Sequence, residues 1–326
     1  MDTSPSLTPE ESPGSDAHPP RIAVLIPCRD EAVTIAEVVR AFQSALPAAR
    51  IHVYDNGSTD GTAKVAAAAG AFVRQEMRPG KGVVVRRMFA EIEAEAYVLV
   101  DGDGTYDAAD APEMVRLLLE DGLDMVTGIR VDSSPASYRR GHRFGNWVLT
   151  TLVRQVFGDR ISDMLSGYRV FSRRFVKSFP ALSTGFETET EFTVHALELG
   201  LPLGELHTRY SERPEGSASK LRTWRDGIRI LHTIVNLVRE ERPLMFFSAC
   251  GTVCMLIGLG LAVPVIAQYM AIGLVPRLPT AILAACLELL GFLSVFCGLI
   301  LDSVARGRKE AKRLAYLAVS RTLPPA

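Results

Sequence analysis

The sequence has almost no net charge, because 36 lysine and arginine residues stand against 37 aspartate and glutamate residues in 326 positions. Without a basic excess the chain lacks the field that attracts nucleic acid phosphates, so we expect no nucleic acid partner. Cysteine is scarce: Cys28 is the only one before the apolar C-terminal part. We therefore expect neither a zinc site nor a disulfide framework. The N-terminus lacks a cationic segment followed by an apolar core, so we expect no signal peptide.

Hydrophobic residues make up 48% of the chain. That share excludes disorder throughout and suffices for one large or two modest domains. Residues 1–20 differ from the rest, because they are acidic, rich in proline and serine, and nearly free of large apolar side chains. We expect them to form a disordered tail.

Two long apolar stretches stand near the C-terminal end. Leu244 to Ala267 contains no charged residue, and Thr280 to Leu301 contains only Glu288. A helix rises about 1.5 Å per residue, so each stretch can cross the roughly 30 Å hydrocarbon core of a bilayer. We expect a transmembrane hairpin over residues 244–303, since two helices buried in a soluble bundle would normally carry a polar face. An acid within a span is costly, which makes Glu288 a functional hypothesis unless it bridges subunits or reaches outward.

Basic residues flank this hairpin, whereas its connecting loop has only Arg277. Positive flanks stay in the cytoplasm, so we expect an inner (cytoplasmic) membrane protein with both termini and the preceding domain in the cytoplasm. Residues 304–326 would form a basic cytoplasmic tail. Its cations oppose only Glu310 and are Arg306, Arg308, Lys309, Lys312, Arg313 and Arg321.

Residues 221–243 show apolar side chains at spacings of three and four, with arginines between them. This pattern predicts an amphipathic helix on the membrane surface, and packing on the preceding domain is the alternative. The apolar positions are Leu221, Trp224, Ile228, Leu231, Val235 and Val238.

Short apolar runs alternate with helical patterns in residues 21–220. The runs are nearly continuous in apolar residues, which is typical of strands buried on both faces of a parallel sheet. They predict a doubly wound α/β domain with a mostly parallel sheet. The expected strands are 21–27, 50–55, 71–75, 96–101 and 124–129, and the expected helices are about 32–46, 60–69, 81–95 and 110–121.

Acidic loops follow three of these strands, at the edge where such sheets bind ligands. The loops are residues 27–31, 55–62 and 101–105. Asp101 and Asp103 are two residues apart after a buried strand, so both can reach one hard cation such as Mg²⁺ or Mn²⁺. An EF-hand is excluded because Tyr106 and Pro112 occupy the positions that need glycine and glutamate. Gly80-Lys81-Gly82 opens a helix, but no P-loop pattern surrounds it.

Seven motifs in order carry a resemblance: VLIPCRDE, VYDNGSTDGT, RPGKG, LVDGDGTYD, DMLSGYRVF, GFETETE and RPEGSASKL. Together they resemble the family 2 glycosyltransferases of GT-A fold, a Rossmann-like α/β fold. Within that family they are similar to the polyprenyl-phosphate, dolichyl-phosphate mannose synthase-like enzymes. The match spans about residues 21–225, and a C-terminal membrane hairpin also occurs in that group.

The resemblance implies a donor site for a nucleotide-diphosphate sugar and a metal site for Mg²⁺ or Mn²⁺. Asp101 and Asp103 would bind the metal, with Asp103 also counted as catalytic. Thr105 stands where relatives often have glutamine, and Asn56 stands where many have a second acid. The remaining donor-binding residues would be Pro27, Arg29, Glu31, Asp55 and Lys81.

The resemblance also assigns acceptor and catalytic residues. Asp163 matches a proposed catalytic carboxylate, although it could instead cap a helix or loop. Glu187, Glu189 and Glu191 are alternative site carboxylates, or simply acids at a helix N-terminus. The residues that would meet the acceptor phosphate are Arg130 and either Arg139 or Arg143, although Arg139 and Arg143 could instead belong to a solvated or lipid-facing basic patch. Arg213 and Lys220 flank a lid-like segment that could close over the acceptor phosphate or the donor diphosphate.

Three functions fit these observations. The first is a metal-dependent inverting glycosyltransferase that moves a hexose to a polyprenyl phosphate of the undecaprenyl or dolichyl type, in contact with the lipid bilayer. The second is a GT-A enzyme with a non-lipid or polysaccharide acceptor, although the Q-x-x-R-W motif of processive enzymes is absent from the sequence. The third is a non-catalytic, nucleotide-binding membrane scaffold. A homo-oligomer is compatible with each.

Overall fold

The computed structural model describes residues 19–132, 162–183, 185, 187–214 and 223–323. Its described part contains one seven-stranded sheet in the order β3-β2-β1-β4-β6-β5-β7. The four pairs β1·β2, β1·β4, β2·β3 and β5·β7 are parallel, and β6 runs antiparallel to β4 and β5. The strands are β1 (Ile22–Cys28), β2 (Arg50–Asp55), β3 (Phe72–Gln75), β4 (Ala96–Leu99), β5 (Met125–Asp132), β6 (Arg169–Ser172) and β7 (Leu203–Tyr210).

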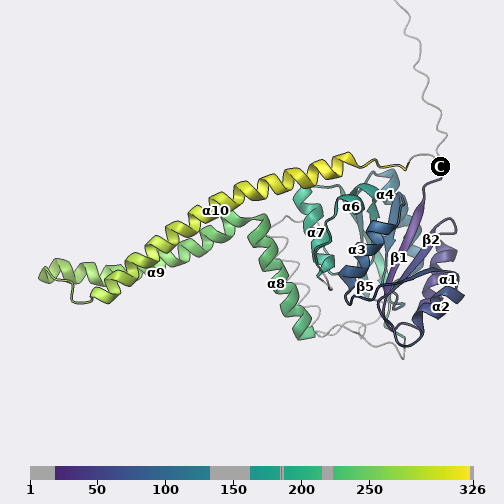
Figure 1. Cartoon of the computed structure of the whole chain (residues 1–326), viewed down its shortest axis with the longest axis horizontal. Helices are drawn as coiled ribbons and strands as arrows, with labels where there is room; N and C mark the ends of the chain where they lie inside the picture. Colours follow the sequence, from purple (N-terminus) through teal and green to yellow (C-terminus); the bar gives the residue numbers. More distant parts are fainter. Residues whose placement is uncertain (1–18, 133–161, 184, 186, 215–222, 324–326) are drawn as a thin grey trace, which may run out of the picture.

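Helices cover both faces of the sheet (Figure 1). One apolar cluster joins one face to α1, α2 and α4, and a second joins the other face to α3, α6 and α7. The predicted doubly wound α/β fold with a mostly parallel sheet is therefore confirmed. The helices are α1 (Ile35–Ala45), α2 (Thr62–Ala68), α3 (Lys81–Glu91), α4 (Ala111–Glu120), α6 (Arg173–Ser178) and α7 (Thr188–Leu199), with a short 3-10 turn η1 (Ala108–Asp110) before α4.

The apolar run of β1 shows why this sequence forms a buried strand. Val24 and Ile26 belong to one cluster, whereas Ala23 and Leu25 belong to the other. Successive side chains of a strand point to opposite faces, so a strand with helices on both sides must be apolar at every position. Burial of these side chains contributes roughly 25 cal/mol per Å² of apolar surface removed from water.

Two strands were not expected from the sequence, and one was longer than expected. β6 and β7 are short or mixed in polarity and complete the sheet around β5. β5 continues to Asp132 because it pairs with β7 along its whole length. The prediction that Arg130 directly follows this strand is wrong, since Arg130 lies within it.

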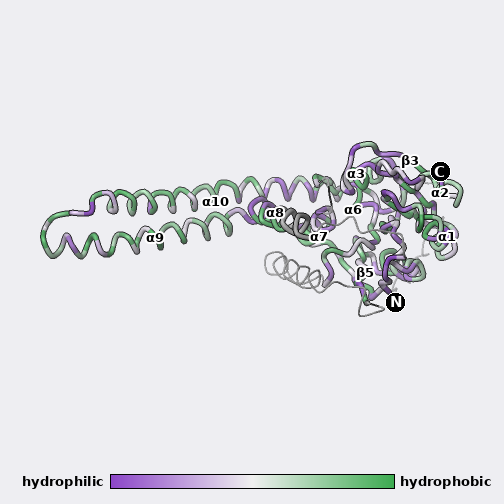
Figure 2. The backbone as a smooth tube through the Cα atoms, turned by 90° about the horizontal axis from the view of Figure 1, so that it is seen from below, coloured by the Kyte–Doolittle hydropathy of each residue, from purple (hydrophilic) through white to green (hydrophobic). Residues whose placement is uncertain are grey.

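Two long apolar helices follow the α/β domain. They are α9 (Pro243–Ile272) and α10 (Leu278–Ala318), and both are long and apolar enough to cross a membrane. They pack side by side as an extended hairpin with a mostly apolar surface (Figure 2). Small residues allow the close approach: a Cβ on Gly251 would lie 2.7 Å from the carbonyl oxygen of Gly291. In the most apolar 18-residue stretch of each helix, only 17% of the residues are buried within the protein.

Helix α10 extends well beyond its apolar part and returns to the α/β domain (Figure 1). The Tyr316 hydroxyl donates a hydrogen bond to Asp124 at 2.8 Å, and the Arg313 guanidinium donates to the carbonyl of Leu199 at 3.3 Å. The segment predicted as a basic cytoplasmic tail thus contains helix and domain contacts up to residue 323. The predicted tail over residues 1–20 falls mainly outside the described residues.

Helix α8 (Thr223–Glu241) runs at a steep angle to the hairpin (Figure 1). Ile234 is buried in a cluster with Met164 and with Val194 of α7. Leu231 and Val235 are exposed. The helix therefore packs on the domain through one part of its apolar surface and leaves another part uncovered.

A buried ion cluster joins the domain to α8 and α10. The Lys312 ammonium lies 2.7 Å from a Glu198 carboxylate oxygen and 2.8 Å from one of Glu241. Burial and the neighbouring Glu241 raise the pKa of Glu198 to about 7, although Lys312 opposes this. One cation between two acids thus holds α7, α8 and α10 together.

We predict that Gly251→Val lowers the apparent melting temperature of the detergent-purified protein by several degrees. The branched side chain would force α9 and α10 apart, and such overpacking costs about 1–3 kcal/mol. Gly260→Val is the matched control on the same helix, because a Cβ there meets nothing within 4 Å. Equal melting temperatures of the two variants would contradict the packing seen here.

We also predict that the contribution of Glu198 to stability falls from about pH 5 to about pH 7, because the folded protein holds the Glu198 proton more tightly than the unfolded chain. The contribution of the protonated carboxyl is fully present below its ordinary pKa of 4.5 and is lost as the pH rises through about 7. Thermal unfolding at several pH values should show a smaller decline in Glu198→Gln than in the wild type. Glu113→Gln, an exposed control, should retain the wild-type slope.

Candidate active site

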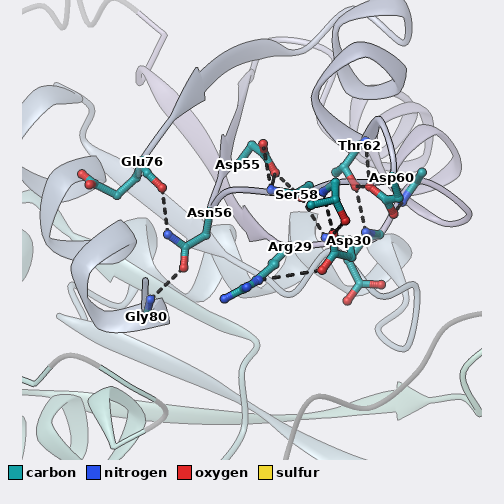
Figure 3. Close-up of polar contacts among 12 residues, drawn as sticks. Arg29, Asp30, Asp55, Asn56, Ser58, Asp60, Thr62, Glu76 and Gly80 are labelled. Carbon is teal, nitrogen blue, oxygen red and sulfur yellow. Dashed lines mark hydrogen bonds and ion pairs between the residues drawn. The ribbon is translucent and has the colours of Figure 1, made fainter. Parts of the chain in front are cut away.

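The strand order brings the three predicted acidic loops together. β2, β1 and β4 are adjacent and parallel, so their carboxyl ends lie at the same edge of the sheet. The loop after β1 and the loop after β2 are tied to each other (Figure 3): the Asp30 carboxylate accepts a hydrogen bond from the Thr59 amide at 2.8 Å. The Glu31 amide donates to the Thr62 hydroxyl at 2.8 Å. This pairing makes one rigid edge from two separate loops.

The predicted donor residues lie around this edge. Pro27 is part of β1, Arg29 is exposed with its guanidinium 3.8 Å from Asp30, and the Glu31 side chain is buried. Asp55 is 1% exposed and accepts hydrogen bonds from the amide and hydroxyl of Ser58. A buried carboxylate fixed at a strand end is suited to accept hydrogen bonds from a ribose or base.

Asn56 holds the next part of the site in place. Its amide nitrogen donates to the carbonyl of Glu76, and its oxygen accepts from the Gly80 amide at 2.8 Å (Figure 3). The same amide nitrogen also donates to the carbonyl of Arg78. A carboxylate at this position could not donate the bonds to these two carbonyls. Asparagine here thus fixes the turn that delivers Lys81 at the start of α3.

Lys81 lies between two carboxylates. Its ammonium is 2.6 Å from an Asp101 oxygen and 2.6 Å from a Glu189 oxygen, and its side chain is 9% exposed. Burial lowers the pKa of Lys81, but the two acids outweigh burial and raise it above its ordinary value. Burial raises the pKa of Glu189, against the effect of Lys81. Lys81 therefore carries its charge and balances Asp101 and Glu189.

Asp103 is the more buried member of the D-x-D pair. One carboxylate oxygen accepts hydrogen bonds from the amide and hydroxyl of Thr105, at 3.1 and 2.6 Å. The other lies 2.5 Å from the Arg213 guanidinium. Burial, and next the charge of Asp101, raise the pKa of Asp103. Thr105, which stands where relatives often have glutamine, thus orients the Asp103 carboxylate.

The pair can accommodate a hard divalent cation. Both side chains offer carboxylate oxygens, and a Cβ on Gly167 would lie 2.4 Å from an Asp101 oxygen, so glycine there leaves the carboxylate its space. Among the described residues, no group of three or more histidine, cysteine or acidic side chains forms a complete ligand set. Mg²⁺ characteristically binds one or two carboxylates together with substrate phosphates and water, and such an arrangement fits two acids alone.

Arg130 and Asp163 form a second charged pair. Two guanidinium nitrogens of Arg130 donate to the two carboxylate oxygens of Asp163, at 2.7 and 2.8 Å. The Arg130 guanidinium also lies over the Tyr210 ring, 5.6 Å from its centre. Its fork of donors matches phosphate as well as carboxylate, so this arginine could exchange Asp163 for a bound phosphate.

The remaining predictions have different outcomes. Glu187 and Glu191 accept hydrogen bonds from nearby backbone amides, those of Gly185 and Ser183. Glu189 instead reaches the site through Lys81, although the sequence favoured no single acid of the three. The predicted acceptor residues Arg139, Arg143 and Lys220 lie outside the described residues.

Comparisons with known proteins identify the family of the chain. Residues 23–179 match the family model described as glycosyl transferase family 2. The chain is 33% identical to glycosyltransferase AglJ of Haloferax volcanii over 302 residues, which cover 92% of this chain and 99% of that protein. It is 28% identical to a dolichyl-phosphate hexose transferase of the same organism, over 57% of this chain and 80% of that one.

A solved structure shares the fold. Glucosyl-3-phosphoglycerate synthase of Mycobacterium tuberculosis, in complex with Mn²⁺, UDP and glucosyl-3-phosphoglycerate, superposes with a TM-score of 0.56 at 22% identity. The match covers 67% of this chain and 80% of that one. The nearly full-length match to AglJ, together with two aspartates held at the carboxyl edge of such a sheet, shows that the chain belongs to glycosyl transferase family 2 and has a GT-A fold.

Proposed function

We propose that this glycosyltransferase moves a hexose, with inversion, from a nucleotide-diphosphate sugar to a polyprenyl phosphate, with Mg²⁺ or Mn²⁺ as cofactor. One observation carries the proposal: each aspartate of the D-x-D pair is matched by a basic side chain, Lys81 or Arg213. If Asp101 and Asp103 held a metal ion, Lys81 could turn to a diphosphate oxygen of the donor and Arg213 could turn to the acceptor phosphate. The mycobacterial synthase, which shares the fold, was solved with UDP and Mn²⁺ or Mg²⁺.

The donor half of the site would use the rigid edge described above. Asp55 would accept hydrogen bonds from the nucleoside, with Pro27, Arg29 and Glu31 beside it. Asp101 and Asp103 would hold the metal ion, which when bound neutralises the diphosphate and stabilises it as the leaving group. Lys81 would stay near the diphosphate because Glu189 keeps it at the edge of the sheet.

The acceptor half would use Arg130 and Arg213. Both are ion-paired to acids of the site, and guanidinium groups bind phosphate through paired hydrogen bonds. The dolichyl-phosphate hexose transferase among the relatives supports a lipid phosphate as acceptor. The apolar hairpin supports the same choice, because a membrane anchor places the domain where a polyprenyl phosphate resides.

The chemistry follows from these charges. A phosphate oxygen of the acceptor attacks the anomeric carbon and forms the new bond, while the bond from that carbon to the nucleoside diphosphate breaks. The acceptor phosphate is already ionised near neutral pH, so a strong general base is not required. Arg130 and Arg213 would align the attacking phosphate, Asp163 would hold Arg130 before the acceptor arrives, and Lys81 would stabilise the departing charge.

We propose a membrane arrangement to match. α9 and the apolar part of α10 would span the inner membrane, with the catalytic domain and both termini in the cytoplasm. Because α8 crosses the hairpin direction, it would lie along the membrane surface with Leu231 and Val235 toward the lipid. This arrangement would bring the acceptor phosphate to the level of the catalytic domain.

The decisive assay uses purified protein in detergent with undecaprenyl phosphate, Mg²⁺ or Mn²⁺, and a set of UDP- and GDP-sugars. We predict one EDTA-sensitive lipid product, detected by mass, and a loss of at least about 100-fold in Asp103→Asn because the metal site is impaired. Asp121→Asn is the matched control, since Asp121 ends α4 away from the site. Full activity of Asp103→Asn would refute the metal assignment.

The same assay separates the other functions. Nucleotide release without a lipid product would indicate a different acceptor. Nucleotide binding with neither product nor release would indicate a scaffold.

We further predict that Arg130→Lys raises the KM for the lipid acceptor about tenfold and changes the KM for the donor much less. Lysine keeps the charge but loses the paired donors that fit phosphate. Steady-state kinetics with each substrate varied in turn would measure both constants. Arg116→Lys, which changes an exposed arginine of α4, serves as the control, and an equal rise of both KM values in Arg130→Lys would argue against an acceptor role.

A further inference from the structure

A cavity is lined by residues from the end of α8, the start of α9 and the middle of α10. These three helices meet at one corner of the molecule (Figure 1). The cavity has a volume of about 330 Å³, and its walls are mostly apolar. The walls come from the start of α9, at Pro243 and Phe247, and from α10, at Leu301 and Val304. Leu301 ends the apolar part of α10, so the cavity would stand at the boundary between hydrocarbon and headgroups.

Two arginines stand beside these apolar walls. Arg239 comes from the last turn of α8, and Arg308 comes from α10, one turn after Val304. Arg308 donates a hydrogen bond to the backbone carbonyl of Glu240. Arg239 lies 3.7 Å from the Glu240 carboxylate, in a pair whose side chains are about half exposed. An exposed pair of this kind is weak, so the guanidinium groups remain available to a stronger anion.

We propose that this cavity binds an anionic glycerophospholipid of the surrounding bilayer. The headgroup phosphate would lie on Arg239 and Arg308, and the first part of an acyl chain would lie on Phe247, Leu301 and Val304. Basic pockets between helices on the cytoplasmic side are suited to such headgroups. The proposal rests on the membrane anchoring proposed above and is independent of the sugar-transfer reaction.

The position of the cavity favours a structural phospholipid over the acceptor. All its lining residues come from α8, α9 and α10, and none comes from the sheet edge that holds Asp101 and Asp103. An acceptor phosphate must reach bonding distance of the donor sugar, which lies at that edge. A lipid in the cavity would instead brace the turn between α8 and α9 against α10.

The test measures lipid retention by native mass spectrometry on the full chain in detergent, without donor. We expect phosphatidylglycerol to bind in preference to phosphatidylcholine. Each arginine should contribute about fivefold, so Arg239→Gln/Arg308→Gln should weaken binding of phosphatidylglycerol by about 25-fold. Arg306→Gln/Lys309→Gln removes the same charge from residues of α10 outside the cavity and should change binding less than twofold. Equal losses in the two double variants would overturn the proposal.

A variant that is expected to strengthen lipid binding keeps the test independent of folding damage. Glu240→Gln removes the acid that competes for Arg239, so it should tighten phosphatidylglycerol binding, and unchanged or weaker binding would count against the site.

Preferential retention of undecaprenyl phosphate, lost in the arginine variant, would overturn the phospholipid assignment in favour of the acceptor. Because the readout needs no turnover, absence of a lipid-linked sugar in the transfer assay would refute the proposed function without affecting this result. Failure of the wild type to float with liposomes would refute the anchoring itself.

Discussion

The buried ammonium of Lys81 is the interaction around which the catalytic domain is organised. It joins the start of α3, the loop after β4 and the first turn of α7, because it lies 2.6 Å from both Asp101 and Glu189. Two acids this close would repel each other if no cation lay between them, and breaking a buried ion pair typically costs about 3–5 kcal/mol. The hydrogen bond between the Asn56 side chain and the Gly80 amide fixes the turn that precedes this lysine. The geometry of the proposed metal site therefore depends on contacts between segments far apart in the sequence.

Helix α7 connects that cluster to α8 and to the end of α10. Its first turn carries Glu189, which faces Lys81, and its last turn carries Glu198, which faces Lys312 of α10. Each end therefore has a buried acid held by a cation from another element. Between the two ends, Val194 packs with Ile234 of α8. A movement of α8 or α10 relative to the domain would act on the same helix that positions the lysine of the site.

The fold and part of the site could be predicted because they follow from local patterns. A run that is apolar at every position indicates a strand buried on both faces, and the acids directly after it must lie at the carboxyl edge. The partners of those acids could not be predicted, since Glu189 meets Lys81 across a long stretch of sequence and Arg130 meets Asp163 only after β5 and the segment before β6 are placed. The basic residues after the hairpin indicated a tail, but charge alone does not show that Lys312 and Arg313 bind acids and carbonyls of the domain.

The continuous course of α10 sets how the domain stands relative to the hairpin. A helix that leaves an apolar span without a break carries its direction onward, and here its last turns are fixed to the domain through Tyr316 and the residues that follow. A flexible tail would let the domain tumble, whereas a helix clamped at Asp124 and at Glu198 restricts it. If the acceptor is a membrane lipid, as proposed above, that restriction would keep the site at one height above the bilayer. The orientational entropy of the domain relative to the hairpin would then be lost once, on folding, instead of each time the enzyme meets its acceptor.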